Sequence, residues 1–349
     1  MRVDYLIVGQ GLAGSVLART LLRAGKTVHV VDTHRVNSAS RVAAGMFNPI
    51  VFKRLNKSWM ADEALPFAAD FYREWEQELG LHVWHPTPIL RIFPNQEAAN
   101  DFDARSAAEG FAHILHTNTR ADGEAQDAPY GYGAVEGSGY LELGLLLDTQ
   151  RQVWMDAGLH TEADWCEQDT KVTPEGITWN GITAGHIVLC QGHALLDGTW
   201  FGDLPLRRTK GEVVDVCQPG LSLSHIVNNG RWAIPLGEGR FRLGATYEWH
   251  TGDPSITPEA RALLLDKLAP VVGAHPEVQA QRGGIRPAVK DRRPLLGTHP
   301  QMARVHVFNG MGTRGVMIAP TVAEWMRDHL LGTASIPQVA DFQRFRSEK

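Results

Sequence analysis

The sequence predicts an α/β protein in which a Rossmann-like nucleotide-binding domain is interleaved with an antiparallel-sheet α+β domain. Residues 3–32 show the pattern of a strand, a glycine-rich turn, a helix and a second strand, and buried-strand patterns recur at 186–190 and 305–308. Between these, strand-like runs from 208 to 248 alternate with Gly- and Asn-containing turns, which is typical of antiparallel hairpins. A chain of 349 residues suits two domains better than one simple core.

Composition narrows the function classes. A formal net charge of −5 provides no basic field for a phosphate backbone, so nucleic acid is not expected as a main partner. Three isolated cysteines, without a C-x-x-C pair, favour a reducing compartment over a disulfide framework. His82/His85 and His113/His116 lack a third ligand at fitting spacing, so we expect no metal. Neither a signal peptide nor a membrane span is apparent, and we expect a cytoplasmic protein. Its oligomeric state is left open.

The first forty residues carry the strongest local signal. Val3–Val8 runs into Gly9-Gln10-Gly11-Leu12-Ala13-Gly14, which opens a helix, and the next strand ends at Asp32. Gly9 permits a tight turn, Gly11 a close backbone approach to a diphosphate, and Gly14 close packing of helix on strand. The helix N-terminus offers free N–H groups and a positive dipole end. The residues expected to bind the diphosphate and ribose are Gly9, Gly11, Leu12, Ala13, Gly14, Asp32 and Thr33.

The acid at the end of the second strand limits which nucleotide can bind. The Asp32 carboxylate would accept hydrogen bonds from a ribose and repel a 2′-phosphate, which disfavours NADP. This fingerprint alone does not separate FAD from NAD.

The rest of the chain divides between the two domains. We predict helices at 61–79, 95–110 and 139–157, one strand over 83–93, a loop over 118–133, a proline-started helix after Thr257 and a C-terminal helix over 316–331. We expect 1–80, 138–200 and 286–349 in the nucleotide-binding domain, and 81–137 and 201–285 in the substrate-binding domain.

Further motifs extend in order through the chain. They are Val188–Gly192, Lys210-Gly211-Glu212-Val213, Leu243–Thr246, the block Gly284–Gly297 and the segment Asn309–Pro320. With the N-terminal fingerprint, the sequence resembles the D-amino-acid oxidase superfamily, in particular glycine oxidase, sarcosine oxidase and D-amino-acid dehydrogenase-like flavoproteins. The resemblance implies non-covalent FAD and the removal of a hydride from the carbon next to nitrogen in an amine or amino acid, with the flavin as the reactive centre.

The same resemblance implies the residues around the flavin. A glycine-rich turn that enters a helix directs N–H groups and a dipole at the ring, where negative charge develops on reduction; the alternative is an ordinary turn. No cysteine lies near Arg286, where sarcosine oxidase relatives attach flavin covalently. The cofactor residues implied are Ala44, Gly45, Met46, Val172, Gln191, Gly192, Arg286, Gly310, Gly312, Thr313, Arg314, Gly315 and Val316.

Arg286 is the principal substrate candidate. In glycine oxidase relatives the matching arginine clamps the substrate carboxylate, for which a guanidinium fork is suited; the alternative is a structural arginine that pairs with Asp291. Arg242 falls where sarcosine oxidase relatives carry an oxygen-activating lysine, or lies on a solvated strand face. Tyr247 is a pocket candidate, and so are Trp232, Trp249 and His250, although core packing is the commoner use of tryptophan. Lys53 and Arg54 bind an acidic substrate or are plain surface.

Other functions remain open at this level. The main alternative is a flavin-dependent monooxygenase that uses NAD(P)H, and others are a non-catalytic protein that retains the fold and an oxidase of a modified nucleoside or tRNA side chain. The sequence does not decide between oxidase and dehydrogenase, nor does it identify the substrate.

Overall fold

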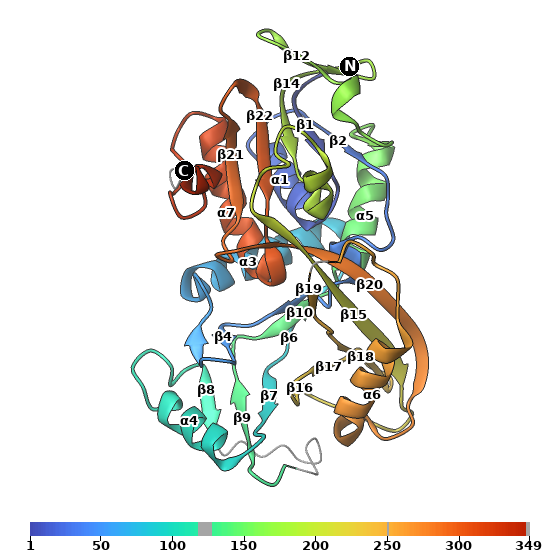
Figure 1. Ribbon diagram of the computed structural model, residues 1–349, viewed down its shortest axis with the longest axis vertical. Coiled ribbons are helices and arrows are strands. Elements are labelled where there is room, and N and C mark those ends of the chain that lie inside the picture. Colours follow the sequence, from blue (N-terminus) through green and yellow to red (C-terminus); the bar gives the residue numbers. More distant parts are fainter. Residues whose placement is uncertain (118–127, 250, 347–349) are drawn as a thin grey trace.

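Two β-sheets, each with its own helices, divide the molecule (Figure 1). The computed structural model describes residues 1–117, 128–249 and 251–346. The first sheet contains parallel strands and the second is mostly antiparallel, so the predicted mixed α/β fold class is confirmed. Within the described residues, no helix combines the length and apolar character needed to cross a membrane.

The first sheet is formed around strand β1, which pairs in parallel with β2 on one side and β14 on the other. β11 extends the sheet beyond β2, and β22 pairs in parallel with β14. The N-terminal and C-terminal parts of the chain are therefore separated by a single strand, β14. The strands of this sheet are β1 Arg2–Val8, β2 Val28–Asp32, β11 His160–Glu162, β12 Lys171–Thr173, β13 Gly176–Trp179, β14 Ile182–Leu189, β21 Leu295–His299 and β22 Met302–Asn309.

Helices α1 (Leu12–Arg23), α3 (Ala61–Leu79) and α7 (Gly315–Leu330) pack together beside this sheet, near α5 (Leu143–Asp156). The apolar residues of α1 recur at helical spacing and are buried, while Gly25 (φ 74°) ends the helix in the left-handed region. Tyr72 and Trp75 are fully buried in the common core, as their spacing predicts.

The second sheet is dominated by a long antiparallel pair, β15 with β20, which forms the diagonal ribbon in Figure 1. Helix α6 (Pro258–Val272) packs against this sheet, and its predicted start is confirmed because Thr257 Oγ1 accepts a hydrogen bond from the N–H of Ala260 at 3.2 Å. The strands are β7 Ile89–Ile92, β8 Leu115–Thr117, β9 Tyr132–Val135, β15 Leu206–Cys217, β16 Ile226–Asn228, β17 Trp232–Pro235, β18 Arg240–Gly244, β19 Glu248–Trp249 and β20 Glu277–Val289.

Small elements connect these two parts. β3 (Met46–Phe47), β10 (Gly139–Leu141) and β6 (Trp84–Pro86) form one small sheet, and β4 (Ile50–Val51) pairs with β5 (Asn56–Lys57). The remaining helices are α2 Ala39–Val42, α4 Gln96–Ser106, η1 Glu167–Asp169, η2 Gly192–Asp197, η3 Gly312–Arg314 and η4 Phe342–Phe345.

Two local predictions are wrong. Gly139–Leu141 is a strand that pairs with β3 and β6, and the helix begins only at Leu143. The single strand expected over 83–93 is divided between two sheets, β6 and β7, because Pro86 and Pro88 interrupt it. Strand β21 was not predicted. Part of the loop predicted over 118–133 lies outside the described residues, and β9 begins within its last two positions. The domain boundaries stay a prediction; β20 runs through the one expected at 285/286.

Candidate cofactor and substrate site

A cavity of about 560 Å³ lies where the carboxyl ends of β1, β2, β14 and β22 meet strands β15 and β20 of the second sheet. Open α/β sheets bind ligands at this edge. The turn after β1 and the turn before α7 both line the cavity. The two turns touch there, because a Cβ built on Gly315 would lie 2.8 Å from Leu12 Cδ2.

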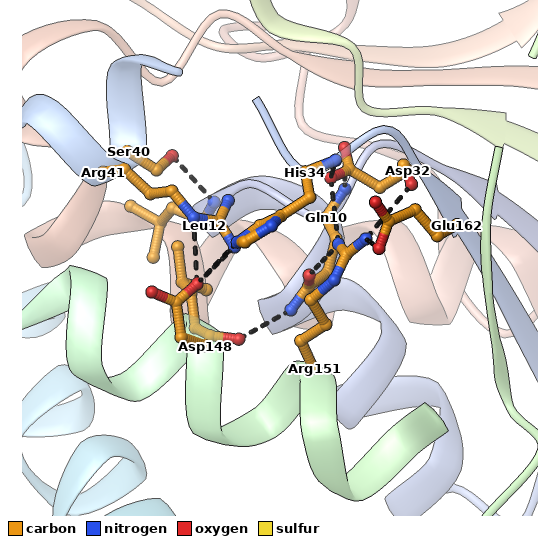
Figure 2. A network of polar contacts seen from close by, with 10 residues as sticks. Gln10, Leu12, Asp32, His34, Ser40, Arg41, Asp148, Arg151 and Glu162 are labelled. Carbon is orange, nitrogen blue, oxygen red and sulfur yellow. Dashed lines mark hydrogen bonds and ion pairs between the residues drawn. The ribbon is translucent and has the colours of Figure 1, made fainter. Parts of the chain in front are cut away.

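The turn after β1 depends on its glycines. Gly9 has φ 101°, and a Cβ there would lie 2.7 Å from the Cys190 carbonyl oxygen. A Cβ on Gly14 would lie 1.8 Å from the Gly9 carbonyl oxygen, so only glycine lets α1 come this close to β1. The N-terminus of α1 has no side-chain cap from Gly11, and the Leu12 N–H donates to Ser40 Oγ at 2.9 Å (Figure 2). This arrangement suits a diphosphate.

Asp32 lines the cavity within a polar network, shown in Figure 2. Its carboxylate accepts hydrogen bonds from the backbone N–H groups of Gln10 (3.0 Å) and His34 (2.9 Å). Arg151, buried on α5, reaches Asp32 Oδ2 at 3.3 Å and Glu162 at 2.9 Å. Arg151 thus neutralises part of the charge that the sequence argument assigned to Asp32, and it holds the acid at the end of β2.

A second ion pair joins α2 to α5 at the same side of the cavity. Arg41 donates from Nε (2.9 Å) and Nη2 (2.6 Å) to Asp148 Oδ1, and His34 Nε2 lies 3.4 Å from the same oxygen. The Arg41 side chain is only 7% exposed. Ser40 and Arg41 therefore fix the 37–45 segment over the N-terminus of α1.

The turn before α7 closes the other end of the cavity. Gly310 and Gly312 have φ of 76° and 58°, and α7 begins at Gly315. Asn309 holds this turn in place, since its Nδ2 donates to the Gly192 carbonyl at 2.9 Å and its Oδ1 accepts from the Gly310 N–H at 2.7 Å. The N-terminus of α7 is thereby directed into the cavity beside Met311 and Val316.

Arg286 lines the cavity from β20. Its Nη1 donates to the Lys210 carbonyl oxygen at 3.2 Å, and its guanidinium lies 5.3 Å from the centre of the Tyr247 ring. Among the described residues no carboxylate pairs with it: Asp291, the alternative partner, binds Arg344 at 2.8 Å. Burial lowers the pKa of Arg286, partly offset by Tyr247, although an arginine stays protonated at neutral pH. A positive charge therefore faces the cavity.

Most of the predicted site residues line this one cavity. Those that do are Gly9, Gly11, Leu12, Ala13, Asp32, Thr33, Ala44, Gly45, Met46, Gln191, Gly192, Arg286, Gly312, Thr313, Gly315 and Val316, with the candidate Trp232.

Other predicted residues lie outside the lining. Gly14 acts through the turn geometry, and Gly310 and Arg314 belong to the α7 turn. Val172 lies on β12 and packs against a core cluster of the first sheet. Tyr247 contacts Arg286 and is 44% exposed.

Arg242 is also away from the lining. It forms two hydrogen bonds with Asp215, at 2.8 and 3.0 Å, so its charge is already paired. This arrangement favours neither an oxygen-activating role nor a free solvated face. Trp249 lies on β19 and is 51% exposed, and His250 lies outside the described residues.

Several lining residues were not predicted. Ser40 and Arg41 lie in the small-residue loop that was noted without assigning them, and Gly211 lies in a motif that was noted only for its resemblance. Trp165 and His193 carry no sequence signal. Within the described part of the chain, no cluster of three His, Cys, Asp or Glu residues has the arrangement of a metal site.

Comparison with known proteins agrees with this geometry. A family model described as "FAD dependent oxidoreductase" (DAO) matches residues 4–329. Glycine oxidase from Bacillus subtilis is 29% identical over 94% of this chain and 93% of its own length. The structure of glycine oxidase from Geobacillus kaustophilus superposes with a TM-score of 0.81 at 21% identity, covering 97% of each chain.

Other relatives are longer. The "tRNA 5-methylaminomethyl-2-thiouridine biosynthesis bifunctional protein MnmC" of Marinobacter nauticus is 25% identical over 93% of this chain, which covers only 55% of that protein. The chain thus spans little more than half the length of some of the curated relatives that it matches.

Proposed function

Since this chain belongs to the DAO family of FAD-dependent oxidoreductases, we propose that it removes a hydride from the carbon next to nitrogen in a small amino acid or amine. In this proposal Arg286 holds the substrate carboxylate. The observation that carries it is a half-buried guanidinium that lines the cavity without a carboxylate partner among the described residues. An unpaired charge that is partly removed from water is costly, and a bound carboxylate would reduce that cost.

The residues of the two glycine turns fit FAD. The Gly9–Gly14 turn and the N-terminus of α1 would hold its diphosphate, Asp32 its ribose, and the Gly312–Val316 turn its ring. FAD, when bound, accepts the hydride. We expect non-covalent binding: of the cysteines, Cys190 lines the cavity, and burial raises the pKa of its thiol, which keeps it protonated and unreactive.

This chain's own residues would position the substrate. Arg286 fixes the carboxylate end of the substrate, so the neighbouring carbon is presented to the ring side of the cavity. Ile285, Trp232 and Ala245 line the same region and give it apolar walls. Such walls favour the neutral amine, which the hydride transfer needs, over the ammonium.

The test is anaerobic reduction of the purified yellow protein. Glycine, sarcosine, other secondary amines and a panel of D-amino acids are added separately, and absorbance near the flavin maximum is followed. We expect at least one carboxylate-bearing amine to bleach the flavin, and peroxide formed on admitting air then separates oxidase from dehydrogenase. Rapid NAD(P)H oxidation without bleaching by any amine would instead support the monooxygenase alternative.

A second candidate substrate is an amine attached to an RNA base, which is what the name of the MnmC relative suggests for that protein. The favouring observation is an exposed aromatic pair, Tyr247 and Trp249, whose ring centroids are 4.8 Å apart. Trp249 and Arg286 both lie opposite Thr209 on β15, one on each side. These rings offer a stacking surface for a base. Bleaching by a modified tRNA, but by no free amino acid, would favour this candidate.

A further inference from the structure

A second cavity, of about 480 Å³, lies between the β4–β5 hairpin and helix α4. It shares no lining residue with the first cavity. In Figure 1 both elements lie in the lower left part of the molecule, away from the first sheet. Ligand binding in this second cavity would be independent of the oxidation reaction.

The second cavity is strongly basic. Lys53 and Arg54 from the hairpin tip, Arg91 from β7 and Arg105 from α4 line it, against a single carboxylate, Asp101. Four positive charges and one negative charge give the lining a formal charge of +3, in a chain whose net charge is −5. Among the described residues none of these four cations forms an ion pair; Lys57, farther along the hairpin, is the one that binds Asp62.

Arg91 is the most constrained of the four cations. Its Nη1 donates to the Phe52 carbonyl oxygen at 3.1 Å, and its guanidinium lies 5.1 Å from the centre of the Phe52 ring. Burial lowers the pKa of Arg91, partly offset by Asp101. One of its five N–H donors is thus used, and within the described chain the others have no protein acceptor. A guanidinium held in this way at a cavity wall can bind an anion through its remaining N–H donors.

The remaining walls leave room beside these charges. Lys53 and Arg54 are exposed at the hairpin tip, and Leu55, in the left-handed region at φ 48°, turns its own side chain inward. Small residues of α4, Ala98 and Ala104, form the facing wall. Arg105 lies 5.1 Å from the Phe111 ring centre, a contact that leaves its donors available.

We propose that this cavity binds a phosphate-bearing anion, held by the Arg91 fork and by Lys53, Arg54 and Arg105. A lining charge of +3 matches a multiply charged group, such as a diphosphate, better than a single carboxylate. The volume lies in the range of small-molecule sites. The phosphate can belong to a free organic phosphate or to a polynucleotide, and the experiment distinguishes these two sources.

The test uses the full chain loaded with FAD, so that the first cavity is filled. Pyrophosphate and a short single-stranded RNA are titrated separately at low salt by calorimetry. The variants are Lys53→Glu, with Arg91→Gln as a second probe of the cavity, and Lys171→Glu as the control. Lys171 is exposed on β12, at the edge of the first sheet, and its substitution changes the net charge equally.

We expect pyrophosphate binding that Lys53→Glu and Arg91→Gln each weaken by about tenfold or more, which is the scale of one charge-assisted hydrogen bond. Lys171→Glu should bind pyrophosphate as the unmodified chain does. RNA binding that is tighter and equally sensitive to Lys53→Glu would identify a polynucleotide as the source, and pyrophosphate binding alone would identify a free phosphate. Absence of binding by both, or equal weakening by Lys53→Glu and Lys171→Glu, would overturn the proposal.

Discussion

Gly211 on β15 makes room for the guanidinium of Arg286 on β20. A Cβ built on Gly211 would lie 2.0 Å from Arg286 Nη2 and 2.2 Å from its Nη1. Gly211 pairs with Gly284, two residues before Arg286, so the arginine side chain crosses diagonally over the glycine. The position of the Arg286 charge therefore depends on a residue that has no side chain.

Gly211→Ala should displace the Arg286 guanidinium without removing it. If Arg286 binds the carboxylate, the KM for an amino-acid substrate should rise by roughly tenfold or more, because a misplaced charged hydrogen bond is lost. The flavin content should stay normal. Gly144→Ala on α5 is the matched control, since a Cβ there meets nothing within 4 Å. Equal kinetics for the two variants would show that the close approach to Arg286 has no role in binding.

Arg286→Gln should discriminate between substrates. For amines with a carboxylate, kcat/KM should fall by about 100-fold, the scale of a lost bidentate charged contact. For an amine of similar size without a carboxylate, it should change by less than about threefold, within the spread of an uncharged contact. The ratio of the two kcat/KM values is the measurement. A uniform decrease for both would instead assign Arg286 to the folding of the site.

The N-terminal turn was predictable because the steric requirement for its glycines comes from residues close to them in the sequence. Gly14 packs against the backbone of Gly9, within the same six-residue motif, so the pattern in sequence and the contact in space coincide. The same holds for the cap at Thr257 and for the buried face of α3. The parallel strand at 186–190 was also recognisable as one unbroken apolar run.

The other features of the site depend on contacts between segments that are far apart in the sequence. Nothing near Gly211 in sequence indicates that Arg286, 75 residues later, lies over it. Arg151 reaches Asp32 across 119 residues, and Asn309 reaches Gly192 across 117. Gly139–Leu141 was predicted to begin a helix. It forms strand β10 because it pairs with β3 and β6, and its own sequence pattern does not reveal that pairing.

Gly14→Ala should prevent the formation of the diphosphate turn. The added Cβ would lie 1.8 Å from the Gly9 carbonyl oxygen, which is backbone and cannot move aside cheaply. We expect a protein purified nearly without flavin and destabilised by at least about 2 kcal/mol, in the range of overpacked sites. The ratio of flavin to protein absorbance and the urea midpoint report this. A yellow Gly14→Ala protein with an unchanged midpoint would contradict the role given to this turn.

A chain of three linked histidines between the first sheet and α7, with His306 buried at its centre, should make stability depend on pH. His306 Nε2 lies 2.9 Å from His186 Nδ1, and Thr298 Oγ1 links His306 (2.9 Å) to His329 (2.8 Å). Burial, then the charges of His186 and His329, lower the pKa of His306 to about 3. The unfolded chain, whose histidine pKa is about 6.5, binds a proton there that the folded chain does not. Stability is therefore retained above pH 6.5 and is lost as the pH falls from about 6.5 toward 3.

His306→Gln should remove one of the titrating groups that make the free energy of unfolding depend on pH. Between about pH 5.5 and 4, the free energy of unfolding of the flavin-loaded chain should fall less steeply than in the unmodified chain, by roughly 1.4 kcal/mol per pH unit. His160, whose pKa burial lowers to about 4, continues to contribute in both proteins. Urea unfolding at several pH values, with FAD in excess, gives both slopes, and His113→Gln, at an exposed position, serves as the control. Parallel pH profiles for His306→Gln and the unmodified chain would show that His306 takes up its proton without unfolding.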